Sequence, residues 1–182
     1  LLFVNGASGY QRYASTVSFA MGNDLEASSF KGDADLMAIG NSLDNAMKGN
    51  DGDNRLEVRG GNDKIKSGDG EDTLVGGSGN DDLSGGDDDD MLAGGTGSDT
   101  LDGGKGHDSF VFLTGWGQDS IEDFEVGTDH LILDLEGITT ASQLQALATQ
   151  TKHDVLFDFG NGDTLLIEDV TVAQVLSNVQ IL

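Results

Sequence analysis

A nine-residue period runs through the middle of the chain and constrains its fold more than any other feature. From Gly40 to Val111 the sequence divides without insertion into eight blocks: GNSLDNAMK, GNDGDNRLE, VRGGNDKIK, SGDGEDTLV, GGSGNDDLS, GGDDDDMLA, GGTGSDTLD and GGKGHDSFV. The blocks beginning at Gly76, Gly94 and Gly103 all read Gly-Gly-x-Gly-x-Asp-x-apolar-x. A fixed short period indicates a repeat architecture in which each unit packs against its neighbours.

Each block has the composition of one turn and one strand. Glycines at positions one, two and four permit the positive φ angles of a tight turn. The final x-apolar-x suits a short strand with one inward side chain. Position eight is apolar throughout, as Met47, Leu56, Ile65, Leu74, Leu83, Leu92, Leu101 and Phe110. Two consecutive blocks therefore make one full coil, and we predict an all-β fold, a parallel β-roll (β-solenoid) of nine-residue half-turns followed by a β-rich C-terminal cap with one short helix.

Acidic residues recur in phase with the period. Position six is Asn45, Asn54, Asp63, Asp72, Asp81, Asp90, Asp99 and Asp108. Between Ser67 and Asp108 there are 12 acidic residues and one basic residue, Lys105. One apolar side chain per block cannot offset the entropy of ordering nine glycine-rich residues, so another source of stability is needed.

A bound hard cation would supply that stability. Stacked coils would bring position-six carboxylates together with turn carbonyls, and a flexible all-oxygen site favours Ca²⁺ over Mg²⁺. The chain has no cysteine, and its three histidines, His107, His130 and His153, are isolated, which argues against softer metals. We therefore expect several Ca²⁺ ions and interpret the histidines as surface residues.

The charge excludes other classes of partner. With 33 acidic and 9 basic residues the formal net charge is −24, which is unsuited to nucleic acid or anionic lipid surfaces. No apolar run approaches the roughly 18 residues that span a bilayer, so we expect no membrane insertion. The chain opens LLFVNGASGY, without Met or a secretory signal pattern, and we interpret it as part of a longer protein.

These repeats resemble the RTX, or haemolysin-type, calcium-binding nonapeptide family. The resemblance implies a β-roll with Ca²⁺ held between turns that lie two blocks apart in the sequence. One turn would supply carbonyls at positions two and four and its Asp, and the other would supply carbonyls at positions one and three and its Asp. Carried over, the four sites comprise Gly77, Gly79, Asp81, Gly94, Thr96 and Asp99; Gly68, Gly70, Asp72, Gly85, Asp87 and Asp90; Gly86, Asp88, Asp90, Gly103, Lys105 and Asp108; and Arg59, Gly61, Asp63, Gly76, Ser78 and Asp81.

Some blocks depart from the pattern. Arg59 and Asp88 replace glycines, although Asp tolerates left-handed backbone conformations better than most residues. Lys105 would take part only through its carbonyl. Asn45 and Asn54 replace the metal-binding Asp without its charge, so we expect the coils before Val58 to lack full-strength calcium sites.

The flanks suggest three regions: residues 1–39 as degenerate N-terminal coils or a cap, 40–111 as the roll, and 112–182 as a C-terminal capping and secretion-signal region. For residues 15–39 an independent small strand element is the alternative. Asp119 and Asp123 either complete a terminal metal site or form a solvated acidic face. Thr140 to Gln143 reads as a helix capping box, and Gly160-Asn161-Gly162 reads as a hairpin turn.

No catalytic arrangement of residues is visible, so we expect this chain not to be an enzyme, although its parent protein could be one. The resemblance implies an extracellular calcium-binding module that folds on Ca²⁺ outside the cell. It would support type I secretion and stability of a larger exported protein, with the secretion machinery and upstream domains as partners. The alternatives are a calcium-rigidified segment of a surface adhesin or S-layer-like protein, and a non-catalytic module of a secreted protease, lipase or polysaccharide-modifying enzyme.

Overall fold

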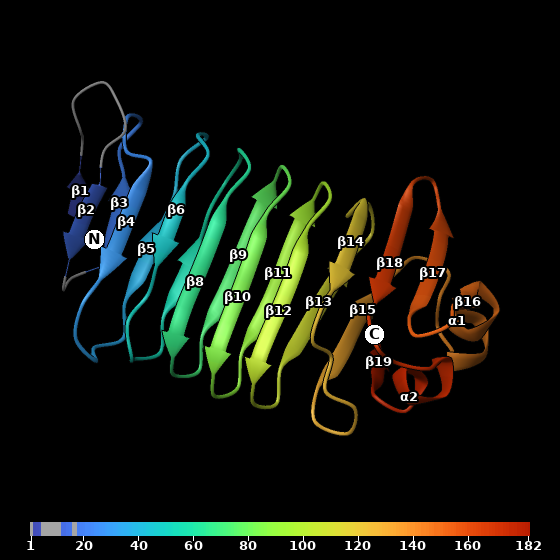
Figure 1. The fold of residues 1–182 in the computed structure, drawn as a ribbon. Coiled ribbons are helices and arrows are strands. Elements are labelled where there is room, and N and C mark those ends of the chain that lie inside the picture. The colour runs from blue at the N-terminus through green and yellow to red at the C-terminus, as the bar shows by residue number, and fades with distance from the viewer. Residues whose placement is uncertain (1, 5–11, 16–17) are drawn as a thin grey trace.

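The chain folds as a long roll of two facing parallel sheets closed at its C-terminal end by a hairpin and two short helices (Figure 1). A computed structural model describes residues 2–4, 12–15 and 18–182. The rest of the expected N-terminal cap, residues 1, 5–11 and 16–17, lies outside the described residues. The predicted all-β parallel β-roll is confirmed.

Consecutive strands alternate between the two sheets. In the described residues the first sheet has nine strands, in the spatial order β1 (Leu2–Val4), β3 (Phe19–Met21), β5 (Met37–Ile39), β7 (Arg55–Glu57), β9 (Thr73–Ser78), β11 (Met91–Thr96), β13 (Ser109–Leu113), β15 (His130–Asp134) and β19 (Val179–Ile181). Strands β3 to β5 continue the roll on the N-terminal side of the repeats.

The second sheet has ten strands within the same described residues. Their order is β16 (Ala148–Gln150), β17 (Val155–Gly160), β18 (Asp163–Ile167), β14 (Gln118–Ile121), β12 (Thr100–Lys105), β10 (Asp82–Asp87), β8 (Lys64–Asp69), β6 (Ala46–Lys48), β4 (Ala27–Phe30) and β2 (Arg12–Ser15). In the repeats each strand pairs in register with the equivalent strand of the next coil, so Leu74 lies beside Leu92 and Leu83 beside Leu101.

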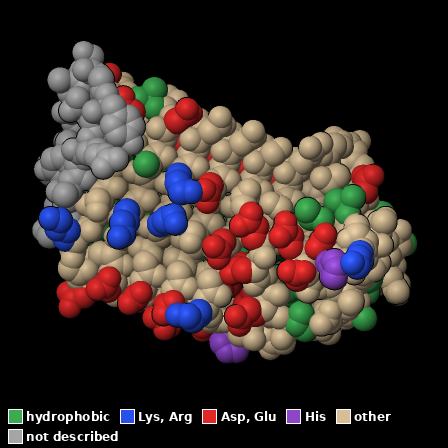
Figure 2. Space-filling model, viewed as in Figure 1, with side chains coloured by type: hydrophobic (Ala, Val, Ile, Leu, Met, Phe, Trp, Pro, Cys, Tyr) green, Lys and Arg blue, Asp and Glu red, His purple; other side chains and the backbone are tan. Residues whose placement is uncertain are grey.

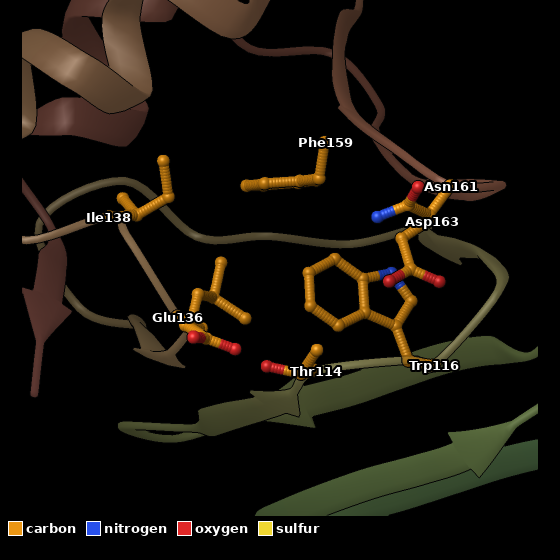
Figure 3. A pocket seen from close by; sticks show the side chains of 8 residues that line it. Thr114, Trp116, Glu136, Ile138, Phe159, Asn161 and Asp163 are labelled. Carbon is orange, nitrogen blue, oxygen red and sulfur yellow. The ribbon is translucent and has the colours of Figure 1, made fainter.

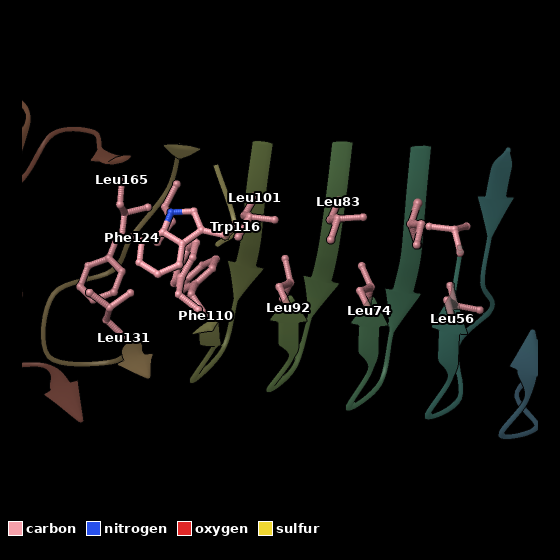
Figure 4. Close-up of a cluster of buried hydrophobic side chains, with 14 of the residues drawn as sticks. Leu56, Leu74, Leu83, Leu92, Leu101, Phe110, Trp116, Phe124, Leu131 and Leu165 are labelled. Carbon is pink, nitrogen blue, oxygen red and sulfur yellow. The ribbon is translucent and has the colours of Figure 1, made fainter. Parts of the chain in front are cut away.

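The core is a thin double row of position-eight side chains. Leu74 and Leu92 project from one sheet toward Leu83 and Leu101 from the other (Figure 4). All four are 0% exposed. This arrangement follows from the x-apolar-x strand pattern, because alternate side chains of a strand point to opposite faces.

The C-terminal region replaces this thin core with aromatic packing. The rings of Phe112 and Phe159 meet Trp116 edge-on, with centroids 5.4 and 4.9 Å from it. The hairpin β17–β18 is antiparallel, as its turn predicted, and β18 joins β14 in the second sheet. This junction continues the roll's core into the C-terminal region.

Two helices cover this end: α1 (Ala141–Leu147) and α2 (Val172–Leu176). As expected of a capping box, the Thr140 side chain accepts a hydrogen bond from the Gln143 N–H at 3.3 Å. The sequence predicted one helix, and α2 was missed because its five residues are too few to show a helical period. No helix among the described residues has the length and hydropathy needed to cross a bilayer.

Candidate calcium sites

The position-six side chains form two hydrogen-bonded ladders along the roll. In each rung, Oδ1 of a carboxylate accepts a hydrogen bond from the position-six backbone N–H of the preceding coil. The Asp63 N–H donates to Asp81 at 2.8 Å, and the Asp81 N–H donates to Asp99 at 2.8 Å. On the other side, Asp72 donates to Asp90 and Asp90 to Asp108, both at 2.8 Å. The two-block coil therefore aligns the carboxylates as the period predicted.

The second oxygen of each carboxylate is left without a protein partner. Buried Oδ2 atoms lacking any hydrogen bond belong to Asp63, Asp72, Asp81, Asp90, Asp99, Asp108 and Asp119. These side chains are at most 3% exposed. A buried, unpaired carboxylate oxygen is costly, so a row of them calls for a positive ligand or a proton.

Burial changes the acidity of this row. It raises the pKa of Asp90 and Asp119 to about 8, and that of Asp99 and Asp108 to about 6, against partial opposition from the backbone N–H donors. Burial raises the pKa of Asp63 to about 7. Neighbouring carboxylates add to the effect, so the ion-free ladder favours protonation where calcium would otherwise supply the charge.

Glycine at position one leaves space beside these orphaned oxygens. A Cβ added to Gly76 would lie 2.5 Å from Asp81 Oδ2 and would also collide with the Gly94 carbonyl oxygen. A Cβ added to Gly85 would lie 2.5 Å from the Gly103 carbonyl oxygen and would collide with Asp90 Oδ2. A carbonyl and a carboxylate thus converge on one small space, which is the donor chemistry that Ca²⁺ prefers.

The structure brings together the residues of the first predicted site. Turn 76–81 stacks on turn 94–99, with Gly77 paired to Gly95. The Thr96 carbonyl accepts a hydrogen bond from the Gly79 N–H at 2.9 Å and retains one lone pair. Gly94 and Asp81 face each other across the space described above. These residues fit an oxygen-coordinated cation.

The third predicted site is built in the same way between turns 85–90 and 103–108. Asp88 has φ 79°, the left-handed conformation that its replacement of glycine requires. The Lys105 side chain points outward, where Nζ pairs with Asp87 at 2.8 Å. The side chain is thus engaged away from the turn, and a role of the Lys105 carbonyl in the site stays a prediction.

The second and fourth predicted sites have a side chain at position one. Ser67 occupies that position in the second site and Val58 in the fourth, and both are buried. The turns still stack, with Gly68 paired to Gly86 and Asp69 to Asp87. That pairing belongs to the second site; in the fourth, the Ser78 N–H donates to the Arg59 carbonyl at 3.2 Å. In both sites a side chain stands where Gly76 and Gly85 leave space.

Beyond the repeats the ladders continue through residues that break the period. The Asp99 N–H donates to Asp119 at 2.9 Å, 20 residues on, and the Asp108 N–H donates to Asp129 at 3.1 Å, 21 residues on. Asp129 was missed by the sequence reasoning, although its Asp-x-Leu spacing matches positions six to eight of a block. Its other oxygen accepts from the Glu125 N–H, so Asp129 is fully partnered.

Asp123 has a different role from Asp119. Its two oxygens accept hydrogen bonds from the Gly103 and Gly104 N–H groups at 2.9 and 2.6 Å. Burial, followed by the Asp123 carboxylate, raises the pKa of Asp102 to about 6. Asp123 therefore closes the last turn by binding backbone donors, whereas Asp119 keeps an orphaned oxygen.

Side-chain charge alone does not build a metal centre here. Within residues 2–4, 12–15 and 18–182, no three His, Cys, Asp or Glu side chains gather as a metal cluster. Any ion would therefore depend on turn carbonyls as well as the ladder carboxylates. Figure 2 shows many further acidic side chains on the surface, with Lys and Arg more frequent toward the N-terminal end.

A hollow of about 210 Å³ lies where the roll meets the C-terminal hairpin (Figure 3). Trp116, Phe159 and Asp163 contribute to its wall. Asp163 accepts hydrogen bonds from the Gly115 and Gly117 N–H groups at 3.0 and 3.1 Å. Its carboxylate is thus occupied in capping a turn.

Comparison with known families agrees with the repeat geometry. A model of four copies of the RTX calcium-binding nonapeptide repeat matches residues 48–83 and again residues 84–121. This chain carries RTX calcium-binding nonapeptide repeats. The RTX repeat segment is thus a calcium-binding β-roll module, and the resemblance drawn from the sequence is confirmed.

Comparisons with whole proteins add little about activity. No curated protein sequence matches the chain significantly. Among solved structures, the extracellular lipase LipA from Serratia marcescens matches with a TM-score of 0.45 and 16% identity, over 89% of this chain and 44% of the lipase chain. The RTX chain thus spans less than half the length of that protein.

Proposed function

We propose that this chain is a calcium-responsive folding module of a larger exported protein. The supporting observation is the row of buried Asp Oδ2 atoms without partners, next to turn carbonyls. Where calcium is scarce, repulsion among the carboxylates disfavours the compact roll. Millimolar external Ca²⁺ would bind the folded form alone and stabilise it by mass action.

The unfolded form suits export. A type I exporter would pass an extended chain, and the outside concentration of calcium would then fold it. Residues 112–182 would supply the cap and the uncleaved secretion signal, as the family resemblance implies. The chain itself would have no catalytic role, and upstream domains would carry any activity of the parent protein.

The direct test is far-UV circular dichroism of this chain during a Ca²⁺ titration, with Mg²⁺ as the control ion. We expect a cooperative gain of β signal that is selective for Ca²⁺. Asp81→Asn should raise the calcium midpoint, because it removes a charged ligand without changing side-chain size. Asp82→Asn removes the same charge one residue away on the outer face and should leave the midpoint nearly unchanged.

A folded spectrum that ignores both calcium and chelator would overturn the switch and make the roll a static scaffold. The export role needs a separate measurement, which is secretion of the chain from cells with and without a type I exporter. Equal retention in both cell types would overturn that role while leaving the calcium response intact.

A further inference from the structure

The residue at position one of each block controls the space that an ion would occupy. At Gly76 and Gly85 an added Cβ would lie within 2.5 Å of both a ladder Oδ2 and the carbonyl oxygen of the following coil. Ca²⁺ binds oxygen at about 2.3–2.6 Å. A side chain at position one and an ion would therefore compete for the same space.

Ser67 fills this space in the second predicted site. Its side chain is buried, and Oγ donates a hydrogen bond to the Gly85 carbonyl oxygen at 2.7 Å. Gly85 is the position-one residue of the following coil, equivalent to Gly94 in the first site. The hydroxyl thus occupies one lone pair of the carbonyl that calcium would bind, and the Ser67 side chain fills the position-one space that is free at Gly76 and Gly85.

Val58 takes the equivalent position in the fourth predicted site, and it is 2% exposed. The neighbouring carbonyl of Arg59, a predicted ligand, accepts hydrogen bonds from both the N–H and the Oγ of Ser78, each at 3.2 Å. Both lone pairs of that carbonyl are therefore in use. An isopropyl group and an occupied carbonyl together leave poor conditions for a hard cation.

We propose that position one acts as a gate, so that Ser67 and Val58 close two of the four predicted sites. Calcium then enters the sites of Asp81 with Gly94 and of Asp90 with Gly103. It does not enter those of Asp72 with Gly85 or of Asp63 with Gly76. This inference rests on the proposed calcium-binding function and deepens it by separating open sites from closed ones.

The test counts calcium ions per chain by native mass spectrometry and equilibrium dialysis on the full chain. Ser67→Gly should bind one ion more than the wild type. Ser67→Ala should bind no more, because the Cβ that obstructs the space remains. Ser98→Gly makes the same exchange at an exposed position five and should leave the count unchanged.

The reciprocal variant keeps the test decisive if a glycine variant folds poorly. Gly76→Ser copies Ser67 into an open site and should lose one ion. An unchanged count in both Ser67→Gly and Gly76→Ser would overturn the gate. So would loss of one ion from the wild type on Asp72→Asn, which would show that the site of Asp72 with Gly85 is open despite Ser67.

The outcomes also separate this inference from the proposed function. A wild-type chain that binds no calcium contradicts the function and the gate together. A wild-type chain that binds calcium, with the same count in all position-one variants, contradicts the gate alone.

Discussion

At the N-terminal end of the roll the ladder side chains are amides, whereas from Asp63 onward they are carboxylates. Asn45 Nδ2 donates to Asn41 Oδ1 at 3.1 Å and to the Leu25 carbonyl at 3.3 Å. Asn54 Nδ2 donates to Asp72 Oδ1 at 3.1 Å. An amide supplies its own donors, while a carboxylate in the same place has acceptors only. The same coil can thus be held by internal hydrogen bonds or made dependent on a cation.

The gate residues fall near the boundary between these two regions. Val58 and Ser67 add apolar volume and a hydroxyl donor just where the amide ladder gives way to the carboxylate ladder. Val58 and Ser67 thus stand at position one of the first two carboxylate blocks, whereas the blocks from Gly76 onward have glycine there. Four further predictions test this contrast, in order of expected effect.

The largest effect is expected in the core, where the two regions should behave alike. Leu56 in β7 and Leu92 in β11 are both 0% exposed. With calcium present, Leu56→Ala and Leu92→Ala should each cost about 2–5 kcal/mol in urea unfolding. The control Met91→Ala, at a residue 46% exposed, should change stability by less than about 0.5 kcal/mol. A much smaller cost at Leu56 would show that the regions differ in packing as well as in ladder chemistry.

Converting the ladder amide of Asn54 to a carboxylate should extend the carboxylate region by one block toward the N-terminus. Asn54→Asp replaces the donor to Asp72 by an oxygen and should destabilise the ion-free chain by about 1–3 kcal/mol. Position one of the Asn54 block is Gly49, which has no side chain. A Cβ there would collide with the Ser67 carbonyl oxygen, so the glycine leaves the space beside that oxygen free for an ion. The difference in unfolding free energy between calcium and chelator should therefore widen.

The control for that variant is Asn62→Asp, which adds the same charge at an exposed position five. It should leave the calcium dependence close to that of the wild type. Equal widening in both variants would assign the effect to net charge instead of to the ladder.

The carboxylate region should also give the ion-free chain a distinctive pH dependence. Burial raises the pKa of Asp90 to about 8 in the fold, above the ordinary value of 3.8. The folded state therefore binds more protons than the unfolded state between these values, so stability falls as pH rises through this range. In chelator, acidification from pH 8 to pH 5 should increase the folded fraction measured by circular dichroism.

Asp90→Asn should flatten that pH dependence, because it removes one of the groups with the largest upward shift. Asp89→Asn, at the exposed neighbouring position, should not flatten it. Stability that rises with pH in chelator would contradict the assignment, since it would require ladder carboxylates that are more acidic in the fold than in the unfolded chain.

The smallest effect is expected for the exposed ion pair between Lys64 of β8 and Asp82 of β10, which joins two coils of the carboxylate region. Both side chains are about half exposed, so a double-mutant cycle should give a coupling of about 0.2–1 kcal/mol. A coupling well above that range would mean that surface pairing, and not the ladder, holds the carboxylate coils together.

The repeat period predicted the strands, the buried position-eight row and the stacking of the Asp side chains, because each depends on local spacing alone. The left-handed Asp88, the capping box at Thr140 and the hairpin also followed from local sequence. The continuation of the ladders to Asp119 and Asp129 did not, since the spacing there changes to 20 and 21 residues. Capping of the Gly115 turn by Asp163 joins residues 48 apart, which no local pattern reveals.

The four calcium sites drawn from the resemblance remain predictions, and the structure shows why their members need not be equivalent. The repeat motif shows which residues can supply oxygen ligands. Whether a side chain at position one obstructs the ion can be seen only in the fold, because the obstructed space lies between that side chain and a carbonyl of the following coil. Ser67 looks like a mild substitution in the sequence, yet its hydroxyl reaches a carbonyl of the following coil.

The ladder also gives the roll a direction. Each rung satisfies the N–H of one coil with a carboxylate from the coil that follows, as when Asp99 donates to Asp119. If the exported chain folds from its N-terminal coils onward, the last folded coil would therefore present N–H donors whose acceptors lie in the coil that is still unfolded. Asp119 and Asp129 accept the last ladder hydrogen bonds, and Asp163 accepts those of the Gly115 and Gly117 N–H groups. The direction of the hydrogen bonds therefore sets the order in which the coils can be completed.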